Sequence, residues 1–406
     1  MKNPFTSVQY GDNPGQVCTR LRAAGAVVPV RLPVLGQVMI TTTHGAASAM
    51  LKDNKRFTMR SKPGAPATGV QWWMPKAMRS LSANMLTSDE PDHRRMRQAV
   101  DQAFQRRSIE SMEAGIRASA DRLLNELAGE TGSVDIQAAY ARRLPLMVIS
   151  DLFGLQASER DQFEKRAARL SGIGGTLDFL AAIPALTGLQ RQLTGIIQRV
   201  RMQQARPGGT SDDQGLLTRL VAQADKGEAL NDEELLAMAL LLLIAGHETT
   251  THVIAQSVLA FERHDDQKTI FLSGDASALV VEECLRFTSA VHLTKPRTVQ
   301  SGGDFHGVSL KKGDRIMACL MAANRDPSVF DAADQFDVLR KPNPHLSFAT
   351  GIHFCLGFQL ARMEISIALE QLYVRYPNLR LAGEPTWKKG WGMRALNGLP
   401  IFLQAG

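Results

Sequence analysis

The sequence predicts a mainly α-helical protein with a small β portion, folded as a single large domain over residues 1–406. Two observations predict the helices. Apolar residues recur every three to four positions through most of residues 90–259, and Asn231 with Glu234 forms a capping-box pattern. A third observation predicts the β portion, because short β-branched runs broken by proline, glycine or turn sequences occur at about 26–42, 304–323 and 379–406. The second of these is predicted to be a hairpin that turns at Lys311–Asp314.

The composition is that of a globular protein able to bury a large core. Apolar residues make up 44% of the chain and charged residues 21%, which excludes a disordered chain, a collagen-like repeat and a small disulfide-stapled domain. The net charge of +7, from 47 Lys and Arg against 40 Asp and Glu, is too dilute to indicate nucleic acid. No phosphate-loop motif is present, so a nucleic-acid or phosphate binder ranks last among the possible functions.

The cysteines and the N-terminus indicate a cytoplasmic location. The four cysteines lie far apart with no disulfide or zinc spacing, and the first residues carry no apolar signal-peptide core. The strongest apolar run, residues 235–245, is shorter than the ~18 residues of a membrane span and is flanked by acidic residues. It belongs to a helix predicted from Asn231 to about Arg263, so we expect a buried core helix and no membrane association.

The segment most informative about function surrounds Cys355. Phe348, Gly351, His353, Cys355 and Gly357 form the pattern F-x-x-G-x-H-x-C-x-G. A helix is predicted to begin near Cys355, and the free N–H groups and dipole at its start favour a thiolate. The two glycines remove side chains where a flat macrocycle would need close approach of the backbone.

A second segment interrupts the long apolar helix with residues that form helices poorly. The sequence is Ala245-Gly-His-Glu-Thr249, followed by two more threonines. Glycine costs about 1 kcal/mol relative to alanine inside a helix, and threonine is also unfavourable there. An acid next to an alcohol at such a point indicates a functional role for Gly246, Glu248 and Thr249.

Together these two segments resemble the cytochrome P450 family of haem-thiolate monooxygenases, and matching segments span about residues 86–400. The resemblance implies the P450 fold, with haem b (iron–protoporphyrin IX) between the long central helix and the helix that follows the cysteine. It also implies that Cys355 is the axial iron ligand, whose thiolate favours O–O cleavage. Ala349 departs from the family, which usually has glycine there, and we expect only slight repacking around its methyl group.

The resemblance also implies roles for the helix residues. Gly246 would make room for dioxygen, Thr249 would hydrogen-bond the bound oxygen, and Glu248 would connect it to water for proton delivery. Ala245 would lie against the haem, as would Phe348, Gly351 and Gly357 on the cysteine side.

Four basic residues are expected to hold the haem propionates. His93 and Arg97 lie four residues apart on one helix face, Arg297 follows a Lys-Pro pair, and His353 lies in the cysteine segment. Guanidinium and imidazole groups suit carboxylates. A further set, Glu283, Arg286 and Arg340, matches the family's E-x-x-R network and is expected to be a buried ion-pair group that fixes the backbone near the cysteine.

The implied reaction uses O2, electrons from NAD(P)H and a hydrophobic small molecule that is hydroxylated or epoxidised. No flavin or iron–sulfur segment is present, so we expect an acidic ferredoxin or flavodoxin and its reductase to supply the electrons. The protein is expected to be a monomer. Basic residues on the cysteine side are the expected docking surface, namely Arg94, Arg95, Arg106 and Arg107.

Several alternatives stay open. A peroxide-driven peroxygenase of the same fold would need less of a proton relay, and a non-catalytic haem sensor or carrier would need neither Glu248 nor Thr249. Substrate contacts are expected from five regions, at about 64–86, 170–189, 241–245, 289–294 and 394–398. The first region contains Trp72, Trp73, Met74, Met78 and Met85, which could pack against an apolar ligand.

Overall fold

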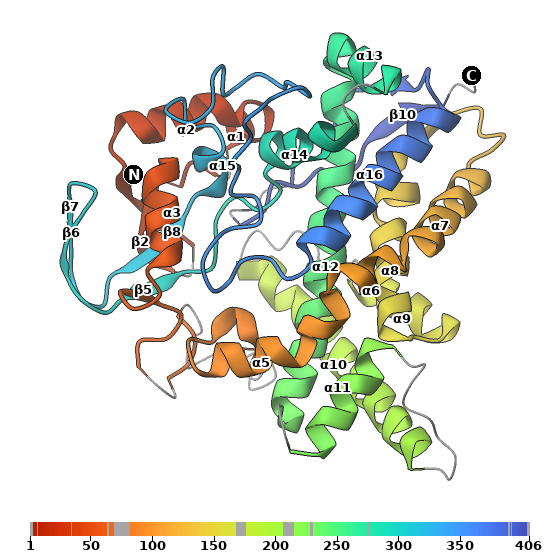
Figure 1. Cartoon of the computed structure of the whole chain (residues 1–406). Coiled ribbons are helices and arrows are strands. Elements are labelled where there is room, and N and C mark those ends of the chain that lie inside the picture. Colours follow the sequence, from red (N-terminus) through yellow and green to blue (C-terminus); the bar gives the residue numbers. More distant parts are fainter. Residues whose placement is uncertain are drawn as a thin grey trace.

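The computed structural model of the chain is mostly helical, with a β-rich part beside the helices (Figure 1). The structure describes residues 3–5, 7–33, 35–62, 65–68, 82–167, 176–205, 215–227, 230–274, 277–388, 390 and 392–403. The five-stranded sheet and the N-terminal helices lie on one side of the central helix α12, and helices α7, α8 and α9 lie on the other (Figure 1). The predicted fold class, mainly α with a small β portion, is confirmed.

The helices of the described residues are the following, in chain order: α1 (Val8–Asp12), α2 (Pro14–Ala23), α3 (His44–Lys52), η1 (Met85–Thr87), α5 (Asp92–Asp101), η2 (Gln102–Phe104), α6 (Arg106–Glu110), α7 (Glu113–Glu126), η3 (Gln137–Ala141), α8 (Arg143–Phe153), α9 (Ala157–Ala167), α10 (Thr176–Gln204), α11 (Leu216–Asp225), α12 (Asp232–Phe261), α13 (Asp265–Ser273), α14 (Ser277–Thr288), α15 (Leu320–Ala323) and α16 (Phe358–Arg375).

The strands form three small sheets. Their bounds are β1 (Val27–Leu32), β2 (Gly36–Thr41), β3 (Phe57–Thr58), β4 (Ser133–Asp135), β5 (Arg297–Val299), β6 (Gly303–Phe305), β7 (Val308–Leu310), β8 (Arg315–Ala318), β9 (Arg380–Leu381) and β10 (Pro400–Phe402). The orders are β1-β2-β8-β5-β3, β4-β10-β9 and β6-β7. Strand β5 lies between β8 and β3, which places its first residue, Arg297, inside the sheet opposite Ile316.

The helix α12 runs through the centre of the molecule (Figure 1), and its start follows from local chemistry. The Asn231 side chain accepts a hydrogen bond from the Glu234 N–H at 2.9 Å, and the Glu234 carboxylate accepts one from the Asn231 N–H at 3.0 Å. The predicted capping box is therefore confirmed. By length and composition α12 could cross a membrane, but 67% of its most apolar window is buried inside the molecule, as in a core helix.

One sequence prediction about strand pairing is wrong. Residues 304–323 were expected to form one hairpin turning at Lys311–Asp314, but β7 pairs with β6 across His306 and Gly307. Both of those residues have positive φ, +51° and +80°, as in the tight turns that match the twist of a hairpin. Strand β8 instead pairs with β5 and β2, and the chain then forms helix α15. Helix α16 begins at Phe358, three residues beyond Cys355.

Candidate active site

The loop before α16 wraps its backbone around Cys355. The Cys355 N–H donates to the Phe348 carbonyl at 3.0 Å, and the Phe354 N–H donates to the Gly351 carbonyl at 3.0 Å. Burial raises the pKa of the Cys355 thiol, while the backbone N–H of Gly357 acts to lower that pKa. The start of the helix thus favours the thiolate, as expected, but burial has the larger effect on the pKa.

Backbone conformation explains the small residues of this loop. Gly351 has φ +77°, and a Cβ built there would lie 2.3 Å from the Leu51 carbonyl oxygen at the end of α3. The absence of a side chain at Gly351 therefore makes room for the backbone at the end of α3. At Gly357 an added Cβ would make only an ordinary contact of 3.8 Å with Phe104. Ala349 has φ +56°, so the cost of its departure from glycine lies in the backbone rather than in the space for a methyl group.

A cation stacked on two aromatic rings holds this loop against α16. The Arg362 guanidinium lies over the rings of Phe348 and Phe358, at 4.7 Å and 5.4 Å from their centroids. It also donates to both carboxylate oxygens of Glu282 on α14, at 2.5 Å and 2.8 Å, and His345 lies 3.1 Å from the same carboxylate. Sequence reasoning missed this cluster, although Arg362 follows the cysteine motif directly.

Burial acts to raise the pKa of Glu282, but the hydrogen bonds from Arg362 and His345 outweigh it. The result is a pKa lowered from 4.5 to about 2. The Glu282 carboxylate is therefore ionised at every pH at which the native fold is expected to function.

The prediction of a buried ion-pair group around Glu283 is confirmed. Arg286 donates through Nε and Nη2 to the two Glu283 oxygens, at 2.7 Å each, and both side chains are fully buried. Arg340 Nε donates to Glu283 at 3.2 Å, as do the Asp337 N–H at 2.9 Å and the Asn343 amide at 3.1 Å. Buried charges are stable only when paired and fully hydrogen-bonded, and this group meets that condition.

Asn324 connects the ion-pair group to the segment that leads into the cysteine loop. Its carbonyl oxygen accepts from Arg286 at 2.8 Å, and its side-chain oxygen accepts from the Leu346 N–H at 2.6 Å. Its amide donates to Ser289 at 2.8 Å and to Ser347 at 2.9 Å. An irregular stretch of chain is thereby fixed without sheet or helix hydrogen bonds.

One stripe in the middle of α12 is not covered by protein. Ala245 is exposed, and Leu241, Ile244, Glu248 and Thr249 are partly exposed, although most of the helix around them is buried. Their spacing of three and four places them on one face. The Thr249 hydroxyl donates to the Ala245 carbonyl at 2.8 Å, so the helix itself orients this alcohol.

Gly246, beside this stripe, and Glu248, within it, face different elements. A Cβ built on Gly246 would lie 3.1 Å from the Ile149 side chain of α8, so the close packing of two helices explains the glycine. Room for dioxygen at Gly246 stays a prediction. Glu248 lies close enough to Lys388 to act on it: burial and then the Arg142 charge lower the pKa of Lys388, and Glu248 acts to raise it.

The four residues expected to hold propionates do come together. His93 and His353 meet edge to face with ring centroids 4.7 Å apart. Burial, and then the charges of Arg297, His93 and Arg97, lower the pKa of His353 to about 3. Residues from α5, β5 and the cysteine loop thus form a single basic cluster, although they lie as much as 260 positions apart in the sequence.

This cluster has few acidic partners. His93 lies 3.7 Å from Glu90, and Arg97 lies 3.5 Å from Asp101. Neither Arg297 nor His353 has an ion-pair partner within the described ranges, and Arg297 donates only to two backbone carbonyls, at 3.2 Å and 3.4 Å. Burial lowers the pKa of Arg297 to about 10, against a smaller opposing effect of Asp89.

The residues present fit a haem. Arg297 carries a buried positive charge without a carboxylate partner within the described ranges, and Arg97 has only Asp101 beside it, so a porphyrin with two propionates would supply the missing negative charge. The low pKa of His353 keeps that imidazole neutral and able to donate a hydrogen bond. Arg97 also donates to the Ile352 and Phe354 carbonyls, at 3.2 Å and 2.7 Å, which ties this cluster directly to the loop of Cys355. A thiol, a basic cluster and an uncovered helix stripe are the features expected of a haem-thiolate protein.

Comparison with known proteins agrees with this geometry. The sequence profile described as Cytochrome P450 matches residues 278–379. A protein named Cytochrome P450 from Bacillus subtilis (strain 168) is 34% identical over 412 residues, which cover 98% of this chain and 96% of that protein. Vitamin D(3) 25-hydroxylase of Pseudonocardia autotrophica is 37% identical over 407 residues, 97% of this chain and 94% of that protein.

Solved structures show the same fold. P450BioI, in complex with an acyl carrier protein ligated to hexadec-9Z-enoic acid, superposes with a TM-score of 0.86 at 31% identity, covering 98% of this chain and 100% of that chain. The chain therefore belongs to the cytochrome P450 family. It is a monooxygenase of the bacterial type, and membership implies haem and the use of O2.

Parts of the expected substrate region lie outside the described residues. They include positions 69–81 with Trp72, Trp73, Met74 and Met78, and positions 168–175. Met85 is described and is buried, and its N–H lies 3.3 Å from the Met238 sulfur on α12.

Replacing Ala349 with glycine should stabilise the protein. A residue with a side chain at φ +56° carries a cost of about 1 kcal/mol that glycine does not. Ala361→Gly, inside α16, is the matched control and should lower stability by about 1 kcal/mol. Urea unfolding of both variants measures the difference, and equal losses in the two would contradict the assigned conformation of Ala349.

Glu282→Gln should change how stability depends on pH. Because the pKa of Glu282 is lowered on folding, the carboxylate contributes stability above pH 4.5, and this contribution is lost as pH falls from 4.5 towards 2. Across this window the free energy of unfolding of the wild type should fall by more than that of the variant, with a difference of at most about 3 kcal/mol. Thermal melts between pH 5 and pH 3 measure the slopes, and parallel curves would exclude Glu282 as the cause.

Proposed function

We propose that this protein hydroxylates or epoxidises a hydrophobic small molecule, using O2 and electrons that originate from NAD(P)H and arrive through separate redox proteins. The observation that carries the proposal is the acid–alcohol pair, Glu248 and Thr249, on the one uncovered stripe of α12 within the described residues. A haem carrier or sensor would have no use for this pair. We also propose that the protein acts as a monomer in the cytoplasm.

The chain's own residues would bind the haem and move protons. Cys355 would hold the iron through its sulfur, while His93, Arg97, Arg297 and His353 would hold the propionates. Haem bound in this way supplies the reduction of dioxygen. The Thr249 hydroxyl, whose hydrogen points to the Ala245 carbonyl, offers its oxygen lone pairs as an acceptor for a water or a proton.

The substrate should be apolar. Leu241 and Ile244 are partly exposed on the same stripe as Thr249 and offer aliphatic surface beside the acid–alcohol pair. The names of the two relatives above, which concern vitamin D(3) and a long unsaturated acyl chain, support a hydrophobic substrate class for this chain as well.

We further propose that an acidic ferredoxin or flavodoxin, reduced by its own reductase, docks beside the cysteine loop. Arg94, Arg106 and Arg107 are exposed on α5 and α6, and Phe104, just before α6, lies next to Gly357. Arg95 does not belong to this surface. It is bound to Glu234 at 2.6 Å and 2.9 Å and so holds α5 against the start of α12.

Cys355→Ala should remove thiolate ligation. The reduced, carbon-monoxide-bound protein should lose the red-shifted absorption band that a thiolate ligand produces, because no sulfur remains to bind the iron. Cys284→Ala removes a fully buried free cysteine elsewhere and should keep the band. Unchanged spectra for Cys355→Ala would mean that another residue is the ligand.

Thr249→Ala should divert electrons from product to hydrogen peroxide while haem binding persists. Loss of the hydroxyl removes one member of the proton-delivering pair, with an expected fall in product formation of roughly tenfold or more. Thr251→Ala is the control, since its hydroxyl makes the equivalent bond to the His247 carbonyl, at 2.8 Å, but is buried. Fully coupled turnover in Thr249→Ala would remove Thr249 from the mechanism, and faster product formation from peroxide alone would favour a peroxygenase.

Reduction by an acidic ferredoxin should slow steeply as salt rises, because opposite charges steer the encounter. Arg107→Glu should slow it roughly fivefold at low salt, which corresponds to about 1 kcal/mol. Lys312→Glu makes the same charge change at the turn between β7 and β8 and should have little effect. Stopped-flow reduction rates measure both, and a salt-independent rate would contradict this docking surface.

A further inference from the structure

A polar stripe continues along α12 from Glu248 towards the helix end. His252 and Gln256 follow Glu248 at intervals of four, which places all three on one face, and Arg263 lies just beyond the last turn. His252 is 2% exposed and Gln256 is 3% exposed, in a helix whose other buried positions are mainly apolar. Buried polar side chains cost free energy unless they are hydrogen-bonded. Gln256 is hydrogen-bonded, because its amide donates to the Arg394 carbonyl at 2.8 Å and its side-chain oxygen accepts from the Arg394 guanidinium at 2.7 Å, so the residue of this row that needs an explanation is His252.

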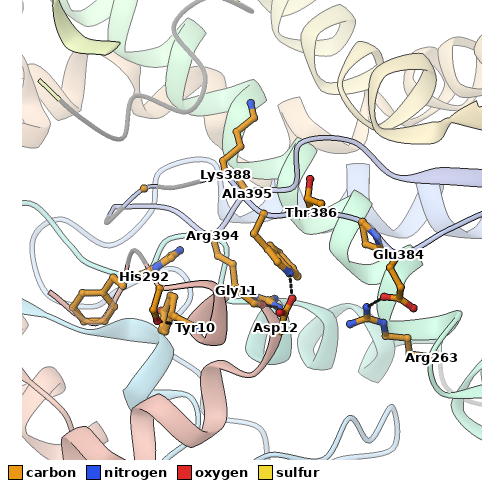
Figure 2. A pocket seen from close by; sticks show the side chains of 15 residues that line it. Tyr10, Gly11, Asp12, Arg263, His292, Glu384, Thr386, Lys388, Arg394 and Ala395 are labelled. Atoms are coloured by element: carbon orange, nitrogen blue, oxygen red, sulfur yellow. Dashed lines mark hydrogen bonds and ion pairs between the residues drawn. The ribbon is translucent and has the colours of Figure 1, made fainter. Parts of the chain in front are cut away.

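The stripe ends at a cavity of about 560 Å³ between the N-terminal segment, the end of α12 and residues 384–395 (Figure 2). Trp387 donates to Asp12 at 3.0 Å, and Arg263 forms an ion pair with Glu384 across the same space. Neither the Cys355 loop nor the basic cluster contributes to its lining. The cavity is therefore separate from the candidate haem site.

Two residues of the cavity lining lie towards Glu248. Lys388 is one, and Figure 2 shows its ammonium end pointing away from Arg394. Glu248 acts on the pKa of Lys388, so the two charges lie near one another. His292 is the other, and His252 lies close enough to act on its pKa. His252 in turn is one helical turn from Glu248, a distance of about 6 Å between Cβ atoms.

The buried polar atoms between the cavity and Glu248 lack hydrogen-bond partners among the residues described. They are Nδ1 of His252 and the hydroxyl of Tyr10, whose ring lies 4.9 Å from that of His292. The ring nitrogens of His292 make no hydrogen bond of good geometry, although the nearby Met393 backbone acts to raise the pKa of His292. Each of these side chains is at most 2% exposed. Buried polar atoms of this kind are the places where ordered water binds inside proteins.

We propose that this cavity is the water entrance of a proton route, in which His292 and then His252 pass protons from water to Glu248. This route rests on the proposed function, because it requires that Glu248 and Thr249 deliver protons. Each imidazole accepts a proton on one ring nitrogen and releases one from the other, so no electrons move and the proton comes from bulk water. Burial lowers the pKa of His292 well below 6.5 and that of His252 to about 3, which keeps both neutral, with one donor and one acceptor nitrogen each.

The test uses His292→Leu and His252→Leu in the haem-loaded enzyme. Because each replaces an unpartnered buried polar group with an apolar one, stability should stay the same or rise. Both variants should keep the carbon-monoxide spectrum and substrate affinity, yet form product roughly tenfold more slowly and release more peroxide per electron pair. His247→Leu is the matched control: this histidine is also buried on α12, but its Nδ1 is held by the Leu243 carbonyl at 2.9 Å.

A second readout does not depend on turnover. In the diamagnetic ferrous, carbon-monoxide-bound protein, ring N–H groups of His292 and His252 should exchange with water protons at least tenfold faster than that of His247, as measured by NMR with nitrogen-15 histidine. Normal coupling in both leucine variants, or exchange as slow as in His247, would overturn the route. If Thr249→Ala uncouples turnover while the histidine variants do not, the proton route is contradicted and the proposed function stands. If Thr249→Ala stays coupled, the proposed role of Thr249, and with it the proposed function, is contradicted.

Discussion

One buried carboxylate organises the cysteine side of this molecule. Glu283 is fully buried and is bound by two arginines, Arg286 and Arg340, together with a backbone N–H and an amide. Residues 324–357 contain little regular structure, so their polar backbone groups need partners from side chains. The Glu283 group and Asn324 supply those partners, and the loop that presents Cys355 is held in place as a result.

The helix α12 combines two requirements that oppose one another. It must pack tightly at the centre of the molecule, and it does so against α8 at Gly246. It must also leave Ala245 and Thr249 uncovered, which gives up the burial that stabilises the rest of the helix. Its capping box and the ion pair between Arg95 and Glu234 stabilise the start of the helix, far from the uncovered stripe.

The basic cluster and the cysteine loop form one unit. Arg97 joins them by donating to loop carbonyls while its charge acts on His353. A buried guanidinium without a carboxylate partner, as Arg297 is within the described residues, is costly, and it is tolerated where an anion is meant to bind. The same argument explains why these residues come from an N-terminal helix, a central strand and a C-terminal loop: a dianionic ligand of haem size spans all three.

Local patterns in the sequence determined the helices, the capping box, Cys355 with its motif and the acid–alcohol pair, because periodicity, capping and motif spacing depend on neighbouring residues. Tertiary structure alone decided that β7 pairs with β6, that Arg95 is bound to Glu234 rather than free for docking, and that Glu282 holds Arg362. It also decided which buried histidines lack partners. Those outcomes depend on which distant groups meet and how deeply they are buried, and neither quantity can be read from the order of residues along the chain.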